Sequence, residues 1–98
     1  MNIDRKLDNG CLTLRVEGCL DTNTAPELEA EMKFDGVKEV DFDFAALQYI
    51  ASAGLRVLMA AHKAMTAAGG TMKVLHPNAM VHSVFEITGL GSIFVIEP

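Results

Sequence analysis

The chain has 98 residues, of which 50% are apolar and 21% charged, and its net charge is −5 at pH 7. A chain of this length is expected to form a single domain over residues 1–98, with a core that needs no disulfide or metal. The negative charge disfavours binding to nucleic acid or to an anionic membrane surface, and no apolar run is long enough to cross a bilayer.

The first ten residues and the two cysteines indicate the cellular compartment in which the protein is expected. Residues 1–10 lack the apolar region of a signal peptide. The two cysteines, Cys11 and Cys19, have no CxxC spacing. We therefore expect reduced thiols in a cytoplasmic protein.

The first elements are a hairpin and a short helix. Apolar and polar residues alternate over 12–17, which indicates a half-buried strand, and the turn at 8–10 suggests an earlier strand over 3–7. A capping box that begins at Thr24 predicts a helix whose inner stripe includes Leu28 and Met32 and which Gly36 ends; the residues that suggest this start are Thr24, Pro26 and Glu27.

The second half of the chain alternates strands with helices. Apolar patterns predict strands over 40–44, 72–75 and 93–96, and helices over 54–68 and 77–88. The resulting order is β-β-α-β-α-β-α-β. This order predicts an α/β fold with a mixed, mostly parallel sheet against which the helices pack.

The helix over 54–68 has two different faces when each residue is rotated by about 100° from the last. Its core face would consist of Val57, Leu58, Ala61, Ala64, Met65 and Ala68. Its outer face would carry Leu55, Arg56, Met59, Lys63 and Thr66, with Ser52 on the same side one turn earlier. Exposed apolar residues beside cations are typical of an interaction surface, although scattered apolar residues are also common on ordinary helices.

Ser52 has two interpretations. A serine just before a helix commonly accepts a hydrogen bond from a backbone N–H as the N-cap. The functional alternative is phosphorylation, because a helix N-terminus tolerates negative charge. A phosphate there would add about two negative charges to a possible partner surface without unfolding the domain.

Enzyme and metal interpretations have less support. Ile50 stands where the G-x-S-x-G elbow of a hydrolase needs its first glycine, and no phosphate-binding or dinucleotide-binding glycine loop occurs, so we expect neither catalysis nor a cofactor. The histidines at 62, 76 and 82 lack metal-ligand spacing on a shared face. Asp21 and Asp43 could form a carboxylate pair, but structural and solvating roles are the simpler interpretation.

Three motifs together resemble the STAS family, whose best-studied members are anti-sigma factor antagonists. "VEGCLDTNTA" at 16–25 resembles the family's strand-end motif, and "VDFDFAALQYIASAGLRVL" at 40–58 resembles its strand, loop and serine-bearing helix start. "VFEITGL" at 84–90 resembles its late Phe-x-x-x-Gly-Leu motif. The resemblance covers almost the whole chain in the family's order and implies the STAS fold.

The resemblance also implies a partner-switching mechanism. Such antagonists bind an anti-sigma factor that is also a serine kinase; phosphorylation releases them, and a phosphatase resets them. The phosphoacceptor here would be Ser52, with Ala51 and Ala53 where relatives often have acidic or hydroxyl residues. The expected partner-binding residues are Asp21, Thr22, Asn23, Ser52, Gly54, Leu55, Arg56, Met59 and Lys63.

A second function stays open at this point. Small STAS proteins also serve as regulatory subunits of ABC-transporter ATPases. The same helix face would then dock without phosphorylation. The partner, rather than the fold, distinguishes the two hypotheses.

Overall fold

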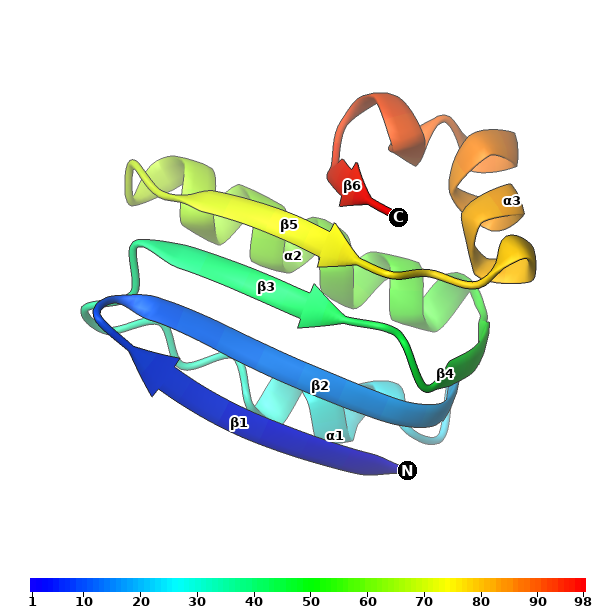
Figure 1. Ribbon diagram of the computed structural model, residues 1–98, viewed down its shortest axis with the longest axis horizontal. Helices are drawn as coiled ribbons and strands as arrows, with labels where there is room; N and C mark the ends of the chain where they lie inside the picture. Colours follow the sequence, from blue (N-terminus) through cyan, green and yellow to red (C-terminus); the bar gives the residue numbers. More distant parts are fainter.

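The computed structural model describes residues 1–98 as a six-stranded sheet with three α-helices (Figure 1). The two helices α1 and α2 cover one face of the sheet, whereas α3 lies past the ends of the strands, against β4 and the 3-10 turn that follows it. In chain order the elements are β1 (Asn2–Asp8), β2 (Cys11–Leu20), α1 (Ala25–Ala30), β3 (Glu39–Asp43), β4 (Leu47–Ile50), α2 (Ser52–Ala67), β5 (Thr71–Leu75), α3 (Ala79–Thr88), a 3-10 turn (Leu90–Ser92) and β6 (Val95–Glu97).

The sheet confirms the predicted mixed topology. Its main path runs β1-β2-β3-β5-β6, in which only the β1–β2 pair is antiparallel. The predicted hairpin is present, because Asn9 and Gly10 both take positive φ angles, 50° and 81°, and bring Asp8 opposite Cys11. Two successive positive φ angles are the conformation of the two-residue hairpin turn that matches strand twist.

The strand β4 is an element that the sequence pattern missed. It pairs in parallel with the end of β2, off the main path, after a register shift between Gly18 and Cys19. Leu47 and Ile50 are buried while the two residues between them are exposed. This four-residue strand therefore lacks the period of two by which strands are detected.

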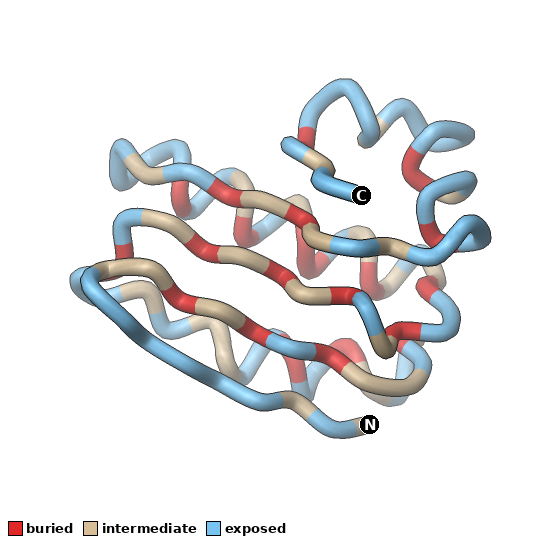
Figure 2. The backbone as a smooth tube through the Cα atoms, viewed as in Figure 1, coloured by how far each residue is buried: buried red, intermediate tan, exposed pale blue.

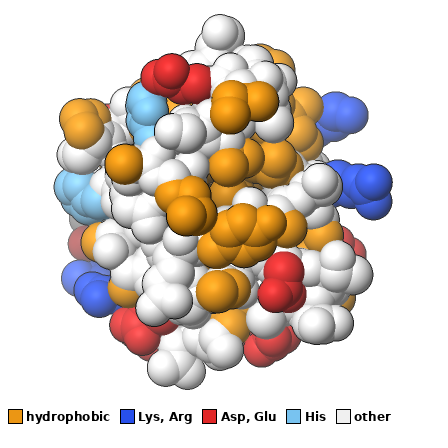
Figure 3. All heavy atoms as spheres, turned by 90° about the vertical axis from the view of Figure 1, so that its right-hand side faces the viewer, with side chains coloured by type: hydrophobic (Ala, Val, Ile, Leu, Met, Phe, Trp, Pro, Cys, Tyr) orange, Lys and Arg blue, Asp and Glu red, His pale blue; other side chains and the backbone are white.

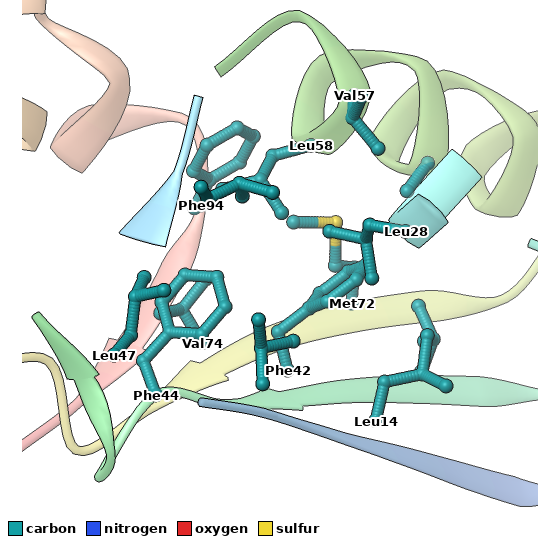
Figure 4. Packing of buried hydrophobic residues seen from close by; sticks show 14 of the residues in the cluster. Leu14, Leu28, Phe42, Phe44, Leu47, Val57, Leu58, Met72, Val74 and Phe94 are labelled. Carbon is teal, nitrogen blue, oxygen red and sulfur yellow. The ribbon is translucent and has the colours of Figure 1, made fainter. Parts of the chain in front are cut away.

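The core lies between the helices and the sheet. Buried residues alternate along the strands (Figure 2), and Figure 4 shows how the side chains from the strands meet those from α1 and α2. The labelled contributors include Leu14, Phe42, Val74 and Met72 from the sheet and Leu28, Val57 and Leu58 from the helices. The opposite face of the sheet has no helix over it and carries polar residues. None of the helices has the length and apolar character that a membrane crossing requires.

Two helix predictions need correction. In α1 the C-cap is Glu31, so Met32 lies beyond the helix and Gly36, with φ 74°, forms a later turn instead of ending it. In α2 the buried residues are Gly54, Val57, Leu58, Ala61 and Met65, whereas Ala64 and Ala68 are exposed. Ala64 lies at the margin of the core face, and Ala68 is the C-cap beyond the end of the helix.

Gly54 lets the start of α2 approach the sheet closely. A Cβ added to Gly54 would lie 2.7 Å from Leu20 Cγ and 2.9 Å from Ile50 Cγ1. Both neighbours belong to fully or almost fully buried side chains. A larger residue would therefore push α2 away from the β2–β4 pair.

We predict that Gly54→Ala lowers the stability of the fold, by roughly 1–3 kcal/mol, because the added methyl group overpacks the core. In an open helix position the same change would raise stability by about 1 kcal/mol. Thermal unfolding, monitored by circular dichroism, shows whether Gly54→Ala lowers or raises the stability. Ala60→Gly, the reverse change at an exposed position of α2, is the matched control and should cost about 1 kcal/mol. A higher melting temperature for Gly54→Ala would contradict the tight contact.

Candidate functional site

The start of α2 is held to β2 by backbone atoms. The Ala51 N–H donates to the Leu20 carbonyl at 2.8 Å, and Ala51 has extended backbone angles, φ −106° and ψ 176°. The Ala51 carbonyl accepts from the amides of Gly54 and Leu55, at 2.9 and 3.1 Å. Ala51 is therefore the N-cap, and Ser52 is the first residue of the helix.

The prediction that Ser52 caps the helix is consequently wrong. The backbone hydrogen bond to β2 fixes the extended residue one position earlier, at Ala51, whose methyl group makes no cap hydrogen bond. The hydroxyl of Ser52 is exposed and bonds to no protein atom. The first turn of α2 also contains no acidic residue. Ser52 thus presents a free hydroxyl beside the positive end of an uncapped helix.

An acidic residue at the cap position should stabilise this helix. Ala51→Asp would supply an acceptor for the free amides of the first turn, which is worth about 1 kcal/mol, or roughly 4–8 °C in melting temperature for a domain of this size. Differential scanning calorimetry measures the shift. Ala68→Asp, at the exposed C-cap of the same helix, should give no such gain because the dipole there is reversed. An unchanged melting temperature for Ala51→Asp would show that the first turn has no free amide to bind.

The loop before α1 is organised by Asp21. Its Oδ1 accepts from the amides of Asn23 and Thr24, at 2.9 and 3.1 Å. Thr24 accepts from the Asp21 amide and donates to the Cys19 carbonyl at 2.7 Å. The expected capping box is therefore wrong, because the Thr24 hydroxyl turns back to the strand and makes no cap hydrogen bond. Asp21 shapes the loop, while Thr22 and Asn23 are exposed at its tip.

The predicted outer face of α2 is only partly exposed. Ser52, Arg56 and Lys63 are exposed, as expected, whereas Leu55 and Met59 are half-buried against the core. Gly54 is buried and lets α2 approach the sheet closely, and its contact with a partner stays a prediction. The exposed part of this face is therefore mainly polar and cationic.

Two exposed apolar residues near Ser52 were not identified from the sequence. Tyr49 in β4 is 45% exposed and Met80 in α3 is 57% exposed. Asn78 brings these segments together, because its Nδ2 donates to the carbonyls of Leu47 and Gln48, and its Oδ1 caps α3 through the Val81 amide. A tyrosine between two buried residues was the available signal in β4, but nothing in the sequence linked it to Met80.

These segments share one end of the molecule, which we call the serine end: residues 21–24, 47–56 and 78–80. Figure 3 shows this end with hydrophobic side chains gathered across its middle, cationic side chains at the right and lower-left margins, and acidic side chains above and below the hydrophobic patch. The serine end therefore combines an apolar patch, a free hydroxyl and nearby positive charge, which suits contact with another protein.

A family model for the STAS domain matches residues 2–98. The chain belongs to the STAS domain family. BtrV of Bordetella bronchiseptica, assigned as an anti-sigma factor antagonist, is 35% identical over 94 residues, covering 93% of this chain and 80% of BtrV. The anti-sigma-B factor antagonist of Staphylococcus aureus is 29% identical over 100 residues, covering 99% and 93% of the two chains.

Solved structures confirm the predicted STAS fold. The anti-sigma factor antagonist SpoIIAA in its unphosphorylated form superposes with a TM-score of 0.85 at 21% identity, covering 97% of this chain and 87% of SpoIIAA. The Bacillus SpoIIAA in its phosphorylated form gives a TM-score of 0.78 at 19% identity, covering 97% and 90%. The fold is thus shared with relatives that have been solved in both forms.

A separate polar cluster of this STAS domain lies on the uncovered face of the sheet, where β2 and β3 begin. Cys11 Sγ lies 3.6 Å from Glu39 Oε2 and 3.6 Å from Asp41 Oδ2, and Lys73 Nζ lies 3.8 Å from Glu39 Oε1. Burial, then the charge of Asp41, raises the pKa of Cys11 to about 11. Burial and the neighbouring Glu39 raise the pKa of Asp41 above its ordinary value.

The donor atoms of Cys11, Glu39 and Asp41 lie within 4.8 Å of one another, a spacing that the sequence did not reveal. A divalent ion there would have to displace the proton that the raised pKa keeps on the thiol. The cluster lies at the start of β2 and β3, whereas Ser52 lies near the other end of β2. Asp43, the other carboxylate singled out from the sequence, accepts from the Ala45 amide at 3.0 Å and shapes a turn.

We predict that the charge of Asp41 lowers the stability of the fold, and that this effect depends on pH. Because the folded-state pKa of Asp41 exceeds the unfolded value, the folded state takes up the proton first as pH falls, so stability rises on acidification through the folded pKa and levels off below about pH 4. Asp41→Asn removes the charge of this half-buried group. It should raise the melting temperature at pH 7, and the difference from the parent should shrink towards pH 4.

Melting temperatures of both proteins across that pH range test this expectation. Asp4→Asn on β1, where the aspartate is exposed, is the control and should differ little from the parent at any pH. A less stable Asp41→Asn variant at pH 7, or a difference that does not depend on pH, would contradict the assigned cost of the Asp41 charge.

Proposed function

We propose that this protein is an anti-sigma factor antagonist that binds an anti-sigma factor with serine kinase activity and is released by phosphorylation of Ser52. The observation that carries the proposal is the exposed Ser52 hydroxyl, free of protein hydrogen bonds, on the first residue of α2. The kinase would transfer the γ-phosphoryl group of ATP to Ser52 Oγ, with release of ADP and the hydroxyl proton. A phosphatase would restore the free hydroxyl.

The serine end supports a protein partner. Tyr49 and Met80 expose apolar area there, and Leu55 lies half-buried between the core and the surface. Aromatic residues and methionine are enriched where proteins meet. Thr22 and Asn23 at the tip of the neighbouring loop, together with Arg56, Met59 and Lys63 on α2, complete the proposed contact surface.

Phosphorylation would change this surface without breaking the fold. The phosphate would sit where the helix dipole and free amides favour negative charge. It would add about two negative charges to the surface that faces the partner. The switch would therefore act on binding while the core stays intact.

The comparisons favour this partner over an ABC-transporter ATPase, because the curated relatives at 35% and 29% identity carry antagonist names. A nucleophilic role for Ser52 has no structural support. The two surface hollows, of about 420 and 160 Å³, are lined by other residues. The His82 ring contacts the Glu86 carboxylate, and the His62 ring packs at a tilt of 59° against Phe94.

Incubation with the cognate anti-sigma factor kinase and ATP, followed by mass spectrometry, tests the proposal. We expect one phosphate on Ser52, none on Ser52→Ala, and normal labelling of Ser83→Ala, a control at another exposed serine. Ser52→Asp should not lower the melting temperature, because the helix dipole favours an acidic residue there, and it should lose binding to the kinase in a titration. Phosphate on another residue, or undiminished binding of Ser52→Asp, would overturn the switch.

A further inference from the structure

Arg56 lies one helical turn after Ser52, and both residues are exposed. Residues four apart in a helix lie on the same face, with their Cβ atoms about 5–6 Å apart. A negative group placed N-terminal to a positive group at this spacing is the favourable orientation. The helix therefore holds a guanidinium within reach of any phosphate on Ser52.

Arg56 has no carboxylate partner within the protein. The close contacts between carboxylates and basic side chains involve Arg15, Lys73 and His82, and none involves Arg56. Helix α2 contains no acidic residue at all, although the whole chain has a net charge of −5. A free guanidinium is thus kept at the serine end of an otherwise acidic protein.

We propose that a phosphate on Ser52 forms an ion pair with Arg56 in the same helix, and that this pair masks the cation that the unmodified protein presents to its partner. The inference rests on the proposed function and adds its mechanism at the surface. Phosphorylation changes two groups at once: a neutral hydroxyl becomes an anion, and a free cation becomes occupied. The guanidinium suits this role because it can bind phosphate oxygens through two parallel N–H groups.

Lys63 provides a matched comparison. It is exposed on the same face of α2 and, like Arg56, forms no ion pair. It lies eleven residues after Ser52, about 16 Å along the helix axis, which exceeds the Debye length of about 8–10 Å at physiological salt. Removal of the Lys63 charge should therefore leave a phosphate on Ser52 almost unaffected.

The test uses phosphoserine inserted at position 52 during translation, so that no kinase is needed. A ³¹P NMR titration gives the second pKa of the phosphate, which is about 6 for a free phosphoserine. We expect a pKa higher by about 0.3 units in Arg56→Gln than in the parent, because the paired cation is lost. Lys63→Gln should match the parent, and the shift should fade at about 1 M salt.

A chemical measurement checks the masking directly. Phenylglyoxal modifies free arginine side chains, and mass spectrometry gives the rate at each one. Phosphorylation should slow modification of Arg56 about twofold and leave Arg15, which pairs with Glu17 on the uncovered face, unchanged as the internal reference. Equal phosphate pKa values in the parent and Arg56→Gln, or equal Arg56 rates with and without phosphate, would overturn the inference.

Failure of the ion pair and failure of the proposed function would give different results in these experiments. If a cognate kinase fails to phosphorylate Ser52, the switch fails, but the phosphate pKa of the inserted phosphoserine still reports on Arg56. If instead the kinase modifies Ser52 while Arg56→Gln leaves the phosphate pKa unchanged, the switch stands and only the ion pair is excluded.

Discussion

The hydrogen bond from the Ala51 amide to the Leu20 carbonyl is the contact on which the serine end depends. It joins the end of β2 to the start of α2, and Gly54 allows the helix to pack tightly against Leu20 at the same place. Because both partners are backbone atoms, the position of Ser52 is set by strand pairing and not by its own side chain. The hydroxyl is left free for chemistry.

In this arrangement the proposed phosphorylation of Ser52 would carry no structural penalty. A serine used as a helix cap would lose its hydrogen bond on phosphorylation, and the helix would have to adjust. Here the cap position belongs to Ala51, so a phosphate on Ser52 would displace no existing interaction. Asp21 makes a comparable contribution nearby, since its carboxylate accepts from the Asn23 and Thr24 amides and holds the loop in place.

The fold was largely predictable from the sequence, because alternation in β2 and β3 and the turn at Asn9 and Gly10 are strong local signals. The site was less so. Whether Ser52 or Ala51 caps α2 depends on a hydrogen bond to a residue 31 positions earlier, which no local pattern contains. The sequence pattern missed β4 because its burial does not alternate. It missed Met80 because the Asn78 hydrogen bonds that join the start of α3 to β4 link residues about 30 positions apart. The family motifs located the serine, but they did not reveal which atoms hold it.

The serine end is built from segments that lie apart in the sequence, and this limits which molecules could compete for its surface. Its surface is assembled from a loop, a short strand and the starts of two helices, which are joined by the Ala51 and Asn78 hydrogen bonds. A linear peptide that copies residues 48–58 would lack the neighbouring segments and, as an isolated short helix, would be largely unfolded in water. Competitors for this surface are therefore better sought among folded domains or rigid scaffolds than among peptides cut from the sequence.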